Sequence, residues 1–365
     1  MSIDDLSFYR GKKVFLTGHT GFKGGWLASW LNDLGAKVHG YSLVPGTEPN
    51  FFSAVELENL MEHEIGDVRD LKGLKRSIKK FEPDVVFHLA AQPLVRLSYQ
   101  IPVETFETNV MGTVNVLEAV RECPGIGACI MITSDKCYLN NEWIYSYREN
   151  DSLGGHDPYS ASKGAAEIVI GSYRSSYFSK AREGRRCGLA SARAGNVIGG
   201  GDWATDRIVP ESVRMLMRSA PIVVRSPFAV RPWQHVLEPL YGYLSLGRCL
   251  ATDPEKYDSA FNFGPMSSNV NVKSLVEMLI EEWGSGTWKD ESDPNAAHEA
   301  TYLRLDSTKS QNLLSWQGVL SVREAVGLSV EWYKEFYAGG DMSAMTTAQI
   351  SKYCDRVKAS ANGGR

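Results

Sequence analysis

The sequence predicts an α/β protein with a doubly wound parallel sheet, joined to a smaller and mostly helical C-terminal part. Two observations support this prediction. In the N-terminal half, short and almost wholly apolar runs alternate with longer amphipathic stretches, which is typical of parallel strands covered by helices on both faces. After Ala194 the pattern changes, because Gly and Pro become frequent and the later segments are polar and helix-rich.

The individual elements follow from local composition. Runs rich in β-branched and apolar residues predict strands at 13–17, 37–41, 84–89, 128–133 and 259–263. We expect the last of these to join the same sheet as the others. Helical patterns predict helices that begin near Phe22 and Val103 and end near Leu34 and Arg121.

The chain is expected to form two interleaved domains. Its length of 365 residues agrees with two domains of roughly 150 residues or more. We assign residues 1–194 and about 236–264 to the first domain, and about 195–235 and 265–355 to the second. The small and polar residues at 356–365 predict a disordered tail.

Charge and composition exclude several function classes. With 39 Lys and Arg against 43 Asp and Glu, the net charge of −4 argues against a general nucleic-acid binder. No apolar run approaches the roughly 18 residues of a membrane span, and the acidic start MSIDD lacks the profile of a secretion signal. None of the six cysteines forms a CxxC pair, so we expect reduced thiols and no metal site. These features predict a soluble, cytoplasmic protein.

A glycine-rich loop directly follows the first predicted strand. Gly18, Gly21 and Gly24 form a G-x-x-G-x-x-G motif that opens a helix, with Thr20, Phe22 and Lys23 between them. Such a loop needs one glycine for a positive φ, one for close approach to a pyrophosphate, and one for helix–strand packing. The helix start then offers N–H groups to the phosphates. The alternative is a tight turn without a ligand, but the strand–loop–helix context favours dinucleotide binding.

Two further positions bear on the same cofactor. Asp67 and Val68 are suited to the amino group and ring face of an adenine, although Asp67 could equally be a turn carboxylate. The acid that usually holds a ribose at the end of the second strand is missing, since Tyr41, Ser42 and Leu43 stand there. The residues alone therefore leave NAD and NADP open.

Tyr159 and Lys163 stand four residues apart in the segment DPYSASK, so on a helix they share one face. We expect the Lys163 ammonium to lower the pKa of Tyr159 below its ordinary value of about 10. Such a tyrosine can take or return the proton of an alcohol during hydride transfer. The alternative is a helix start with an exposed Tyr and Lys, and the upstream glycine loop weighs against it.

Together these motifs resemble the extended short-chain dehydrogenases/reductases that act on nucleotide sugars, a Rossmann-type family that uses NAD. The matching pieces lie between Thr17 and Val236 and include the glycine loop, Asp67, Val68, His88, Leu89, Ala90, Ala91, Asn109, Ser134, Tyr159 and Lys163. The resemblance implies that Leu89, Ala90 and Ala91 line the cofactor groove and that Asn109 helps to position the dinucleotide. It also implies a dinucleotide-binding first domain and a nucleotide-sugar-binding second domain.

The residues after the fifth predicted strand distinguish branches of that family. Here they read Ser134, Asp135, Lys136, Cys137 and Tyr138, which resembles the CDP-glucose 4,6-dehydratases. The resemblance implies that Ser134 binds the substrate alcohol, that Asp135 donates a proton to the leaving hydroxyl on carbon 6, and that Lys136 takes the carbon-5 proton. The alternative for Asp135 and Lys136 is an ion pair at a strand end.

The resemblance also points to substrate contacts and partners. We expect Asn196 to contact the sugar or diphosphate, Arg231 to hold the diphosphate, and Trp203 and Arg207 to shape the nucleotide pocket. For Arg193, substrate binding and structural pairing remain equal alternatives. Relatives dimerise through the helices corresponding to residues 103–121 and 159–177, which implies a homodimer or homotetramer.

The function that these residues favour is the loss of water from CDP-glucose, in a pathway that supplies deoxysugars such as those of O-antigen lipopolysaccharide. A nucleotide-sugar 4-epimerase, or a dehydratase for another nucleotide sugar, remains an alternative. A third, of another class, is a non-catalytic NAD-binding scaffold or sensor. The nucleotide base rests on resemblance alone.

Overall fold

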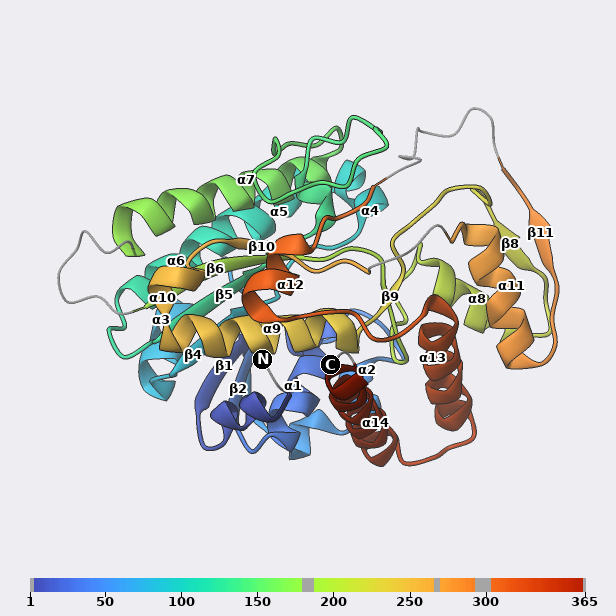
Figure 1. The fold of residues 1–365 in the computed structure, drawn as a ribbon, viewed down its shortest axis with the longest axis horizontal. Helices are drawn as coiled ribbons and strands as arrows, with labels where there is room; N and C mark the ends of the chain where they lie inside the picture. The colour runs from blue at the N-terminus through green and yellow to red at the C-terminus, as the bar shows by residue number, and fades with distance from the viewer. Residues whose placement is uncertain (1–2, 179–186, 266–269, 293–302, 364–365) are drawn as a thin grey trace.

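In the computed structural model, residues 3–178, 187–265, 270–292 and 303–363 are described, and a seven-stranded parallel sheet forms the centre of the molecule (Figure 1). Its strand order is β10-β6-β5-β4-β1-β2-β3. The strands are β1 (Lys13–Thr17), β2 (Lys37–Ser42), β3 (Glu62–Ile65), β4 (Val85–His88), β5 (Ala128–Ile132), β6 (Gly188–Arg193) and β10 (Ala260–Asn262). The predicted fold class is confirmed, and the run at 259–263 does join this sheet.

The strand order reverses between β1 and β4. Thr17 at the end of β1 pairs with Tyr41 of β2 on one side and with His88 of β4 on the other. The chain passes from β1 outward to β3 and then returns to β4 before continuing to β5 and β6. In such sheets ligands bind at the carboxyl ends beside this switch point, where the glycine loop and the segment after His88 lie.

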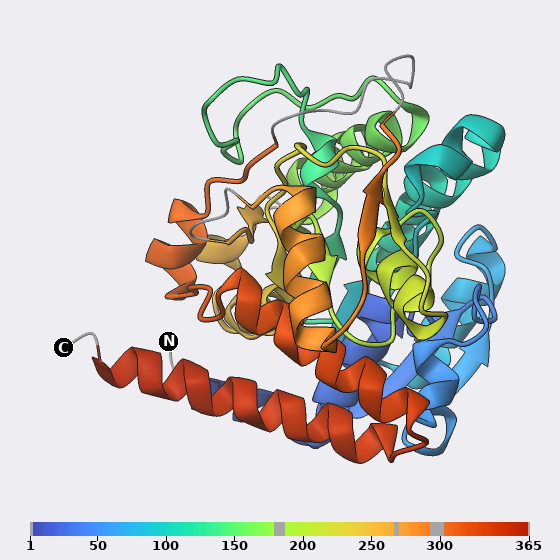
Figure 2. The same cartoon turned by 90° about the vertical axis from the view of Figure 1, so that its right-hand side faces the viewer.

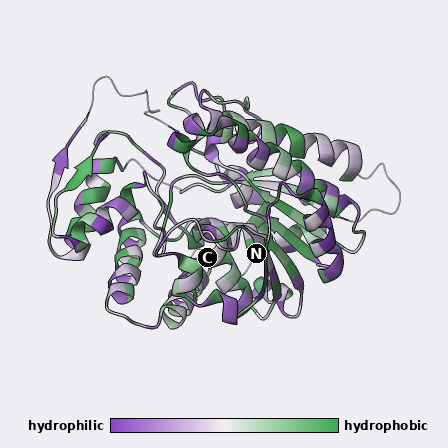
Figure 3. Cartoon of the chain, turned by 180° about the vertical axis from the view of Figure 1, so that it is seen from behind, coloured by the Kyte–Doolittle hydropathy of each residue, from purple (hydrophilic) through white to green (hydrophobic). Residues whose placement is uncertain are grey.

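Helices cover both faces of the sheet (Figure 1). One face carries α3 (Leu71–Phe81), α5 (Pro102–Phe106), η3 (Glu107–Met111), α6 (Gly112–Arg121) and α7 (Pro158–Tyr173). The other face carries α1 (Phe22–Asp33) and α9 (Leu237–Thr252). Alternate residues of a strand pack into the two hydrophobic cores on opposite faces of the sheet. For example, Leu16 packs with α1 and α9, and Phe15 packs with α3 and α6. The strands are apolar and the outer helix faces polar (Figure 3).

The helix predicted over 103–121 is present but contains one irregular turn. The α-helical segments α5 and α6 are separated by a turn of π-helix, η3, that contains Asn109. The Thr113 hydroxyl donates to the Asn109 carbonyl oxygen at 2.8 Å. Turns of this kind interrupt helices at positions where a side chain is displaced toward a site.

The remaining elements are short or lie in the C-terminal part. Short helices connect the main elements: η1 (Ile3–Tyr9), α2 (Phe51–Ala54), η2 (Leu57–Asn59), α4 (Val95–Gln100), η4 (Asp135–Cys137), η5 (Arg174–Phe178), α10 (Pro254–Tyr257) and α12 (Thr308–Leu314). The smaller part contains β7 (Val197–Ile198), α8 (Ile208–Met217), β8 (Ile222–Val224), β9 (Gln234–His235), α11 (Val272–Trp283), β11 (Trp288–Asp290) and α13 (Val322–Tyr337). Within the described ranges, no helix has the length and apolarity needed to cross a membrane.

The prediction of a disordered tail at 356–365 is wrong for residues 356–363. The last helix, α14 (Met342–Gly363), continues through them and lies along one side of the molecule (Figure 2). Val357 is buried, Arg356 pairs with Glu324 at 2.7 Å, and Lys358 pairs with Asp4 at 3.2 Å. Packing against α13 and the N-terminus thus stabilises a segment whose small residues suggested disorder. The last two residues lie outside the described ranges.

Candidate active site

The glycine loop has the close contacts that a phosphate-binding turn requires. Gly18 has a φ of +81°, and a Cβ there would lie 2.7 Å from the backbone nitrogen of Ala90. A Cβ on Gly24 would overlap the carbonyl oxygen of Gly18. Gly21 is the N-cap of α1, and no side chain caps that helix start. The first N–H groups of α1 are therefore available to an anion, so the loop fits a dinucleotide pyrophosphate.

Three of the side chains within this loop point in different directions. Thr20 is committed to the end of β2, because its hydroxyl bonds Ser42 at 2.9 Å and the Leu43 carbonyl oxygen at 2.9 Å. Phe22 packs beside Gly199, whose Cβ would lie 3.1 Å from the ring. Lys23 places its Nζ 5.9 Å from the centre of the Tyr243 ring. These contacts leave the loop backbone, rather than the Thr20 hydroxyl, as the part suited to phosphate.

The residues proposed to contact adenine are held by their neighbours. Arg69 donates to both carboxylate oxygens of Asp67, with Nη2 to Oδ2 at 2.6 Å, and holds the pKa of that carboxyl below its ordinary value. Val68 is buried and packs in the core between the sheet and α6. The Asn115 amide donates to the Val68 carbonyl oxygen at 2.9 Å. Asp67 thus forms an ion pair within the turn, and its contact with an adenine stays a prediction.

The wall opposite the glycine loop follows β4. Leu89, Ala90 and Ala91 are partly exposed there, beside Gly18. Asn109 is buried and clamps this segment, since its Oδ1 accepts from the Gln92 N–H at 2.9 Å and its Nδ2 donates to the Gln92 carbonyl at 3.1 Å. Asn109 therefore supports the groove by holding its wall in place.

Tyr159 and Lys163 lie on one face of α7, as the spacing predicted. Both are buried, and the Lys163 Nζ lies 6.0 Å from the centre of the Tyr159 ring. The expected lowering of the Tyr159 pKa is wrong for this structure. Burial raises that pKa to about 12, a hydrogen bond with Ser134 lowers it, and the Asp135 charge raises it. Burial of the phenol outweighs the attraction of nearby cations.

The predicted residues Ser134, Asp135 and Lys136 lie at the helical turn η4 (Asp135–Cys137) that follows β5. Ser134 is its N-cap, and its Oγ accepts from the Lys136 N–H at 3.2 Å and donates to Asp135 Oδ1 at 2.9 Å. Asp135 is buried, and its Oδ2 has no hydrogen-bond partner among the described residues. A Cβ on Gly195 would overlap this carboxylate, so glycine is required there. Lys136 is partly exposed. Asp135 thus keeps one oxygen for a ligand.

Cationic side chains converge on Asp135 and Tyr159. Burial lowers the pKa of Lys23 to about 8, with Arg207 and Lys163 lowering it further and Asp135 opposing. Burial likewise lowers the pKa of Lys163 to about 8. The Asp202 carboxylate, 2.8 Å from Arg207, raises the pKa of that guanidinium. These cations therefore make the surroundings of one carboxylate and one phenol positive, which suits an anionic substrate.

Two predicted substrate residues lie on loops, one after β6 and one before β9. Asn196 follows β6 with a φ of 45°, and its Oδ1 is buried without a partner in the chain. A non-glycine residue in this conformation is characteristic of functional loops. Arg231 is partly exposed, and its guanidinium donates to the Val230 carbonyl oxygen at 3.1 Å. Both positions remain compatible with a substrate contact.

Two other predicted substrate residues belong to the protein interior. The Arg193 guanidinium is buried and pairs with Glu167 at 2.7 Å, which is structural pairing rather than substrate binding. Trp203 is buried in an aromatic cluster, with ring centres 4.8 Å from Phe336 and 5.7 Å from Trp332. Stacking of Trp203 on a nucleotide ring is therefore not supported. Its aromatic neighbours come from α13, far along the sequence.

The chain matches a known family over most of its length. Residues 15–327 match the family model for GDP-mannose 4,6 dehydratase. The chain belongs to this family. It is 48% identical over 352 residues to the CDP-glucose 4,6-dehydratase of Salmonella typhimurium, covering 96% of this chain and 98% of that enzyme.

Solved structures agree on the fold. The dTDP-glucose 4,6-dehydratase of Bacillus anthracis, in complex with NAD, has a TM-score of 0.73 and 19% identity over 91% of this chain and 100% of that one. The UDP-glucose 4-epimerase of Thermotoga maritima with UDP-glucose has a TM-score of 0.76 and 20% identity over 89% of this chain and 99% of that one. The GDP-mannose 4,6 dehydratase family thus shares its architecture with epimerases.

Sequence reasoning missed two residues that the structure places at this site. Tyr243 on α9 is buried with no partner for its hydroxyl, and both Asp135 and Tyr159 act on it electrostatically. No sequence signal marks it, because α9 reads as an apolar core helix. Glu167 holds the segment that leads into Ser134, since its carboxylate accepts a hydrogen bond from the Thr133 hydroxyl at 2.5 Å. It follows Tyr159 and Lys163 at the same four-residue spacing, and that periodicity could have revealed it.

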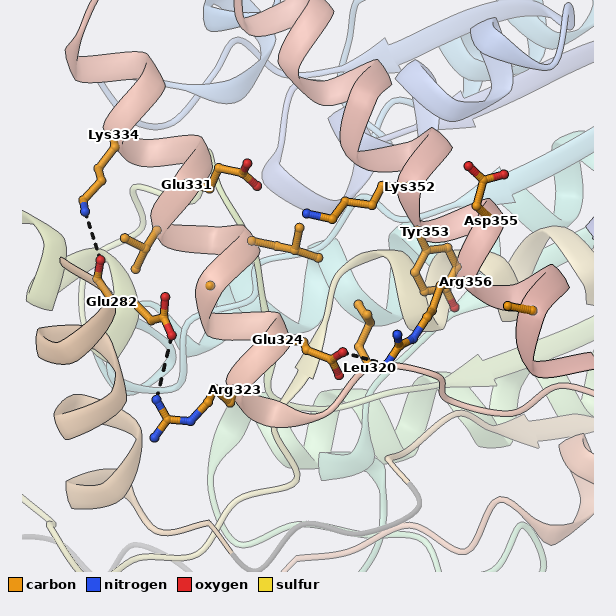
Figure 4. Close-up of a pocket in the computed structure, with 14 residues that line it drawn as sticks. Glu282, Leu320, Arg323, Glu324, Glu331, Lys334, Lys352, Tyr353, Asp355 and Arg356 are labelled. Atoms are coloured by element: carbon orange, nitrogen blue, oxygen red, sulfur yellow. Dashed lines mark hydrogen bonds and ion pairs between the residues drawn. The ribbon is translucent and has the colours of Figure 1, made fainter. Parts of the chain in front are cut away.

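A pocket of about 820 Å³ lies elsewhere, between α11, α13 and α14 (Figure 4). Its charged groups have partners within the lining: Arg323 pairs with Glu282 at 3.8 Å, Arg356 pairs with Glu324 at 2.7 Å, and Lys334 donates to the Glu282 backbone carbonyl at 2.9 Å. None of the predicted site residues lines it. Within the described parts of the chain, no cluster of His, Cys, Asp and Glu is arranged to hold a metal ion.

Proposed function

We propose that this chain is a CDP-glucose 4,6-dehydratase, which converts CDP-glucose to CDP-4-dehydro-6-deoxyglucose with bound NAD. The observation that carries the proposal is the constellation of Ser134, Asp135, Tyr159 and Lys163, with one oxygen of Asp135 kept unpaired. An epimerase needs only the tyrosine and the cofactor, whereas water loss needs an acid for the departing hydroxyl. The 48% identity to an enzyme of this activity, over nearly both full lengths, supports the choice of nucleotide.

The cofactor is proposed to lie along the carboxyl ends of β1 and β4. The backbone around Gly18 and Gly24 receives the pyrophosphate, and the segment held by Asn109 forms the facing wall. NAD, when bound, supplies a hydride acceptor that later returns the same hydride. The chain itself supplies the proton transfers, which follow.

We propose Tyr159 as the acceptor of the carbon-4 hydroxyl proton. Because burial raises its pKa to about 12, the Lys163 charge on the same helix face and the bound cofactor must together favour the phenolate. The resulting ketone acidifies carbon 5, whose proton Lys136 takes and later returns. Asp135 donates a proton to the carbon-6 hydroxyl, which leaves as water. We propose Asn196, Arg207 and Arg231 as the contacts for the sugar and diphosphate.

The proposal is tested by incubating the pure protein with CDP-glucose, UDP-glucose, dTDP-glucose and GDP-mannose, with and without NAD. Product masses are then measured, together with the near-ultraviolet absorbance of a 4-keto-6-deoxy sugar in alkali. We expect loss of one water from CDP-glucose only. An isomer of unchanged mass would favour the epimerase, and no reaction with any substrate would favour a non-catalytic scaffold.

A second test addresses Tyr159 as the proton acceptor. Tyr159→Phe is expected to reduce turnover by at least about a hundredfold while leaving nucleotide-sugar binding within about twofold, because only the proton acceptor is removed. Tyr145→Phe, which alters an exposed tyrosine, serves as the control. Turnover near the wild-type rate in Tyr159→Phe would contradict the assignment.

We also propose a homodimer or homotetramer formed through α5, η3 and α7. Apolar side chains are exposed along these helices, with Val103 at 68%, Met111 at 50% and Ile168 at 62% exposure. Exposed apolar side chains on helices that contact one another favour an association site there. Light scattering coupled to gel filtration is expected to give at least twice the mass of 40.4 kDa, and a monomer mass would overturn the proposal.

A further inference from the structure

The loop between β7 and α8 is held tightly against α1 and α13. A Cβ on Gly200 would overlap the Trp332 side chain, so this close approach requires glycine. The Trp26 indole of α1 donates to the Gly200 carbonyl oxygen at 2.9 Å. The Tyr333 hydroxyl of α13, on a fully buried side chain, donates to the Asp202 carbonyl oxygen. The backbone that leads to Asp202 is therefore fixed by groups from both helices.

The Asp202 side chain connects this fixed backbone to Arg207. It is buried, with 7% of the side chain exposed. Its Oδ1 accepts from the Ala204 N–H at 3.0 Å, and its Oδ2 accepts from Arg207 Nη1 at 2.8 Å. Each carboxylate oxygen thus has a partner, and the two bonds together fix the orientation of the carboxylate. The position of the Arg207 guanidinium is set from that side.

The rest of the Arg207 guanidinium is open to a ligand. Its Nε and Nη2 have no hydrogen-bond partner among the described residues, and the side chain is 35% exposed. The acid that precedes it in the chain, Asp206, is engaged elsewhere, since it pairs with Arg96 at 3.4 Å and with Arg225 at 3.2 Å. A planar guanidinium with free donors matches the oxygens of a phosphate group.

We propose that Asp202 is a positioning residue, which holds the Arg207 guanidinium where it binds the diphosphate of the nucleotide sugar. This inference rests on the proposed function, in which Arg207 contacts the sugar or the diphosphate. The diphosphate is bonded to carbon 1 of the ring whose carbon 4 faces Tyr159, so it lies one sugar ring away from that phenol. The Arg207 charge lowers the Tyr159 pKa, which agrees with this placement.

Holding the guanidinium in place before the substrate arrives favours binding. An arginine side chain that moves freely loses rotamer freedom when a ligand orders it, and this loss weakens binding. Because Asp202 already orders Arg207, the loss on binding is smaller. Without the Asp202 charge, the guanidinium is free to turn to solvent or toward Asp206.

The first experiment measures the affinity for CDP by calorimetry in the wild type and in Asp202→Asn. The asparagine keeps an acceptor for the Ala204 N–H and removes the charge that holds Arg207. We expect the Kd for CDP to rise about tenfold, because a charge-assisted hydrogen bond is lost. The Kd for cytidine, which has no phosphate, should stay within about twofold. Unchanged or tighter CDP binding, or an equal loss for cytidine, would overturn the proposal.

The matched control is Asp206→Asn. It removes a carboxylate from the same loop, next to Arg207, but one that faces Arg96 and Arg225 instead. We expect this variant to bind CDP like the wild type. A loss of CDP affinity equal to that of Asp202→Asn would show a general effect of loop charge and overturn the specific role of Asp202.

The second experiment asks whether Asp202 acts through Arg207. Arg207→Met is compared with the same change combined with Asp202→Asn. The double variant should bind CDP no more weakly than Arg207→Met alone, because the group that Asp202 positions is already absent. A further loss as large as that in the wild-type background would overturn the proposal. NAD affinity should be the same in all variants, and a parallel loss of NAD binding would show a structural role instead.

Steady-state kinetics separate this proposal from the proposed function. In Asp202→Asn the KM for CDP-glucose should rise by the same factor as the Kd for CDP, with kcat within about twofold. If CDP-glucose is converted and Asp202→Asn keeps the wild-type KM, the role of Asp202 is refuted and the proposed function stands. If no nucleotide sugar loses water, yet CDP binding depends on Asp202 only when Arg207 is present, the proposed function fails and the role of Asp202 stands.

Discussion

Removing the Arg193 side chain tests whether this residue serves the substrate or the fold. The Arg193 guanidinium and the Glu167 carboxylate are 2.7 Å apart, with side-chain exposures of 4% and 2%. The guanidinium also donates to the Tyr138 hydroxyl at 2.7 Å and to the Glu149 carbonyl oxygen at 3.0 Å. Glu167 accepts further from Thr133 and Ser191, on the two strands that carry the site. The test substitution is Arg193→Met, which keeps an unbranched apolar side chain and removes the positive charge.

The expected loss of stability comes from the buried Glu167 carboxylate that remains without Arg193. Burial by itself raises the pKa of Glu167, and the Arg193 charge together with the hydrogen bonds holds it below its ordinary value. Without Arg193 the carboxylate stays buried with hydroxyl donors only, and losing one partner of a buried ion pair costs about 3–5 kcal/mol. Arg193→Met combined with Glu167→Gln should recover much of this loss, because no isolated charge then remains.

Urea unfolding at pH 7 without substrate measures this effect. Arg225→Met is the control, since Arg225 pairs with Asp206 at 3.2 Å on the surface and should cost less than about 1 kcal/mol. If Arg193→Met unfolds like this control while its KM for the nucleotide sugar rises, the structural assignment is wrong. Arg193 would then be a substrate ligand.

Three further outcomes follow from the same structure. Lys163→Met should abolish turnover but raise the free energy of unfolding at pH 7 by as much as about 3 kcal/mol. The reason is that burial lowers the Lys163 pKa to about 8, so below that pH the folded chain carries an unfavourable buried charge. The gain in stability should shrink at pH 10, and unfolding midpoints at the two pH values measure it. Burial raises the Glu238 pKa to about 7, so the wild type should lose stability as the pH rises from 4.5 to 7, and a Glu238→Gln variant with the same pH dependence would contradict this. Gly24→Ala should weaken NAD binding at least about tenfold because its Cβ overlaps Gly18, whereas Gly125→Ala, where a Cβ meets nothing within 4 Å, should match the wild type in an NAD titration.

The sheet was predictable from sequence because its strands are continuously apolar. A strand buried on both faces carries mostly apolar side chains, so β1, β4 and β5 stand out against the helices between them. The glycine loop was predictable because backbone contact forbids a Cβ at Gly18 and Gly24. The end of α14 was not predictable, because its order depends on contacts of residues such as Arg356 and Lys358 with distant segments.

The site was predictable where neighbours in sequence are neighbours in space. Ser134 with Asp135, and Tyr159 with Lys163, are separated by one and four residues, so local geometry brings them together. Arg193 and Trp203 follow motif-bearing segments too, yet their partners lie on distant elements and turn them inward. Sequence spacing cannot distinguish an arginine that meets a phosphate from one that meets a buried carboxylate.

The groups that would perform the reaction are also the groups that weaken the fold. Lys163 is a buried cation, and Tyr243 and Asp135 each keep a buried oxygen without a partner in the chain. An unsatisfied buried polar atom costs about 1–3 kcal/mol. Behind them, both Glu167 carboxylate oxygens accept hydrogen bonds and the Arg193 Nη atoms donate, although Arg193 Nε has no partner among the described residues. These bonds tie the pair to β6 and to the end of β5 and so stiffen the site. Stability should therefore rise when Lys163 is removed and fall when Arg193 is removed, while both variants lose activity. This opposite sign separates a residue that acts on the substrate from one that holds the site in place.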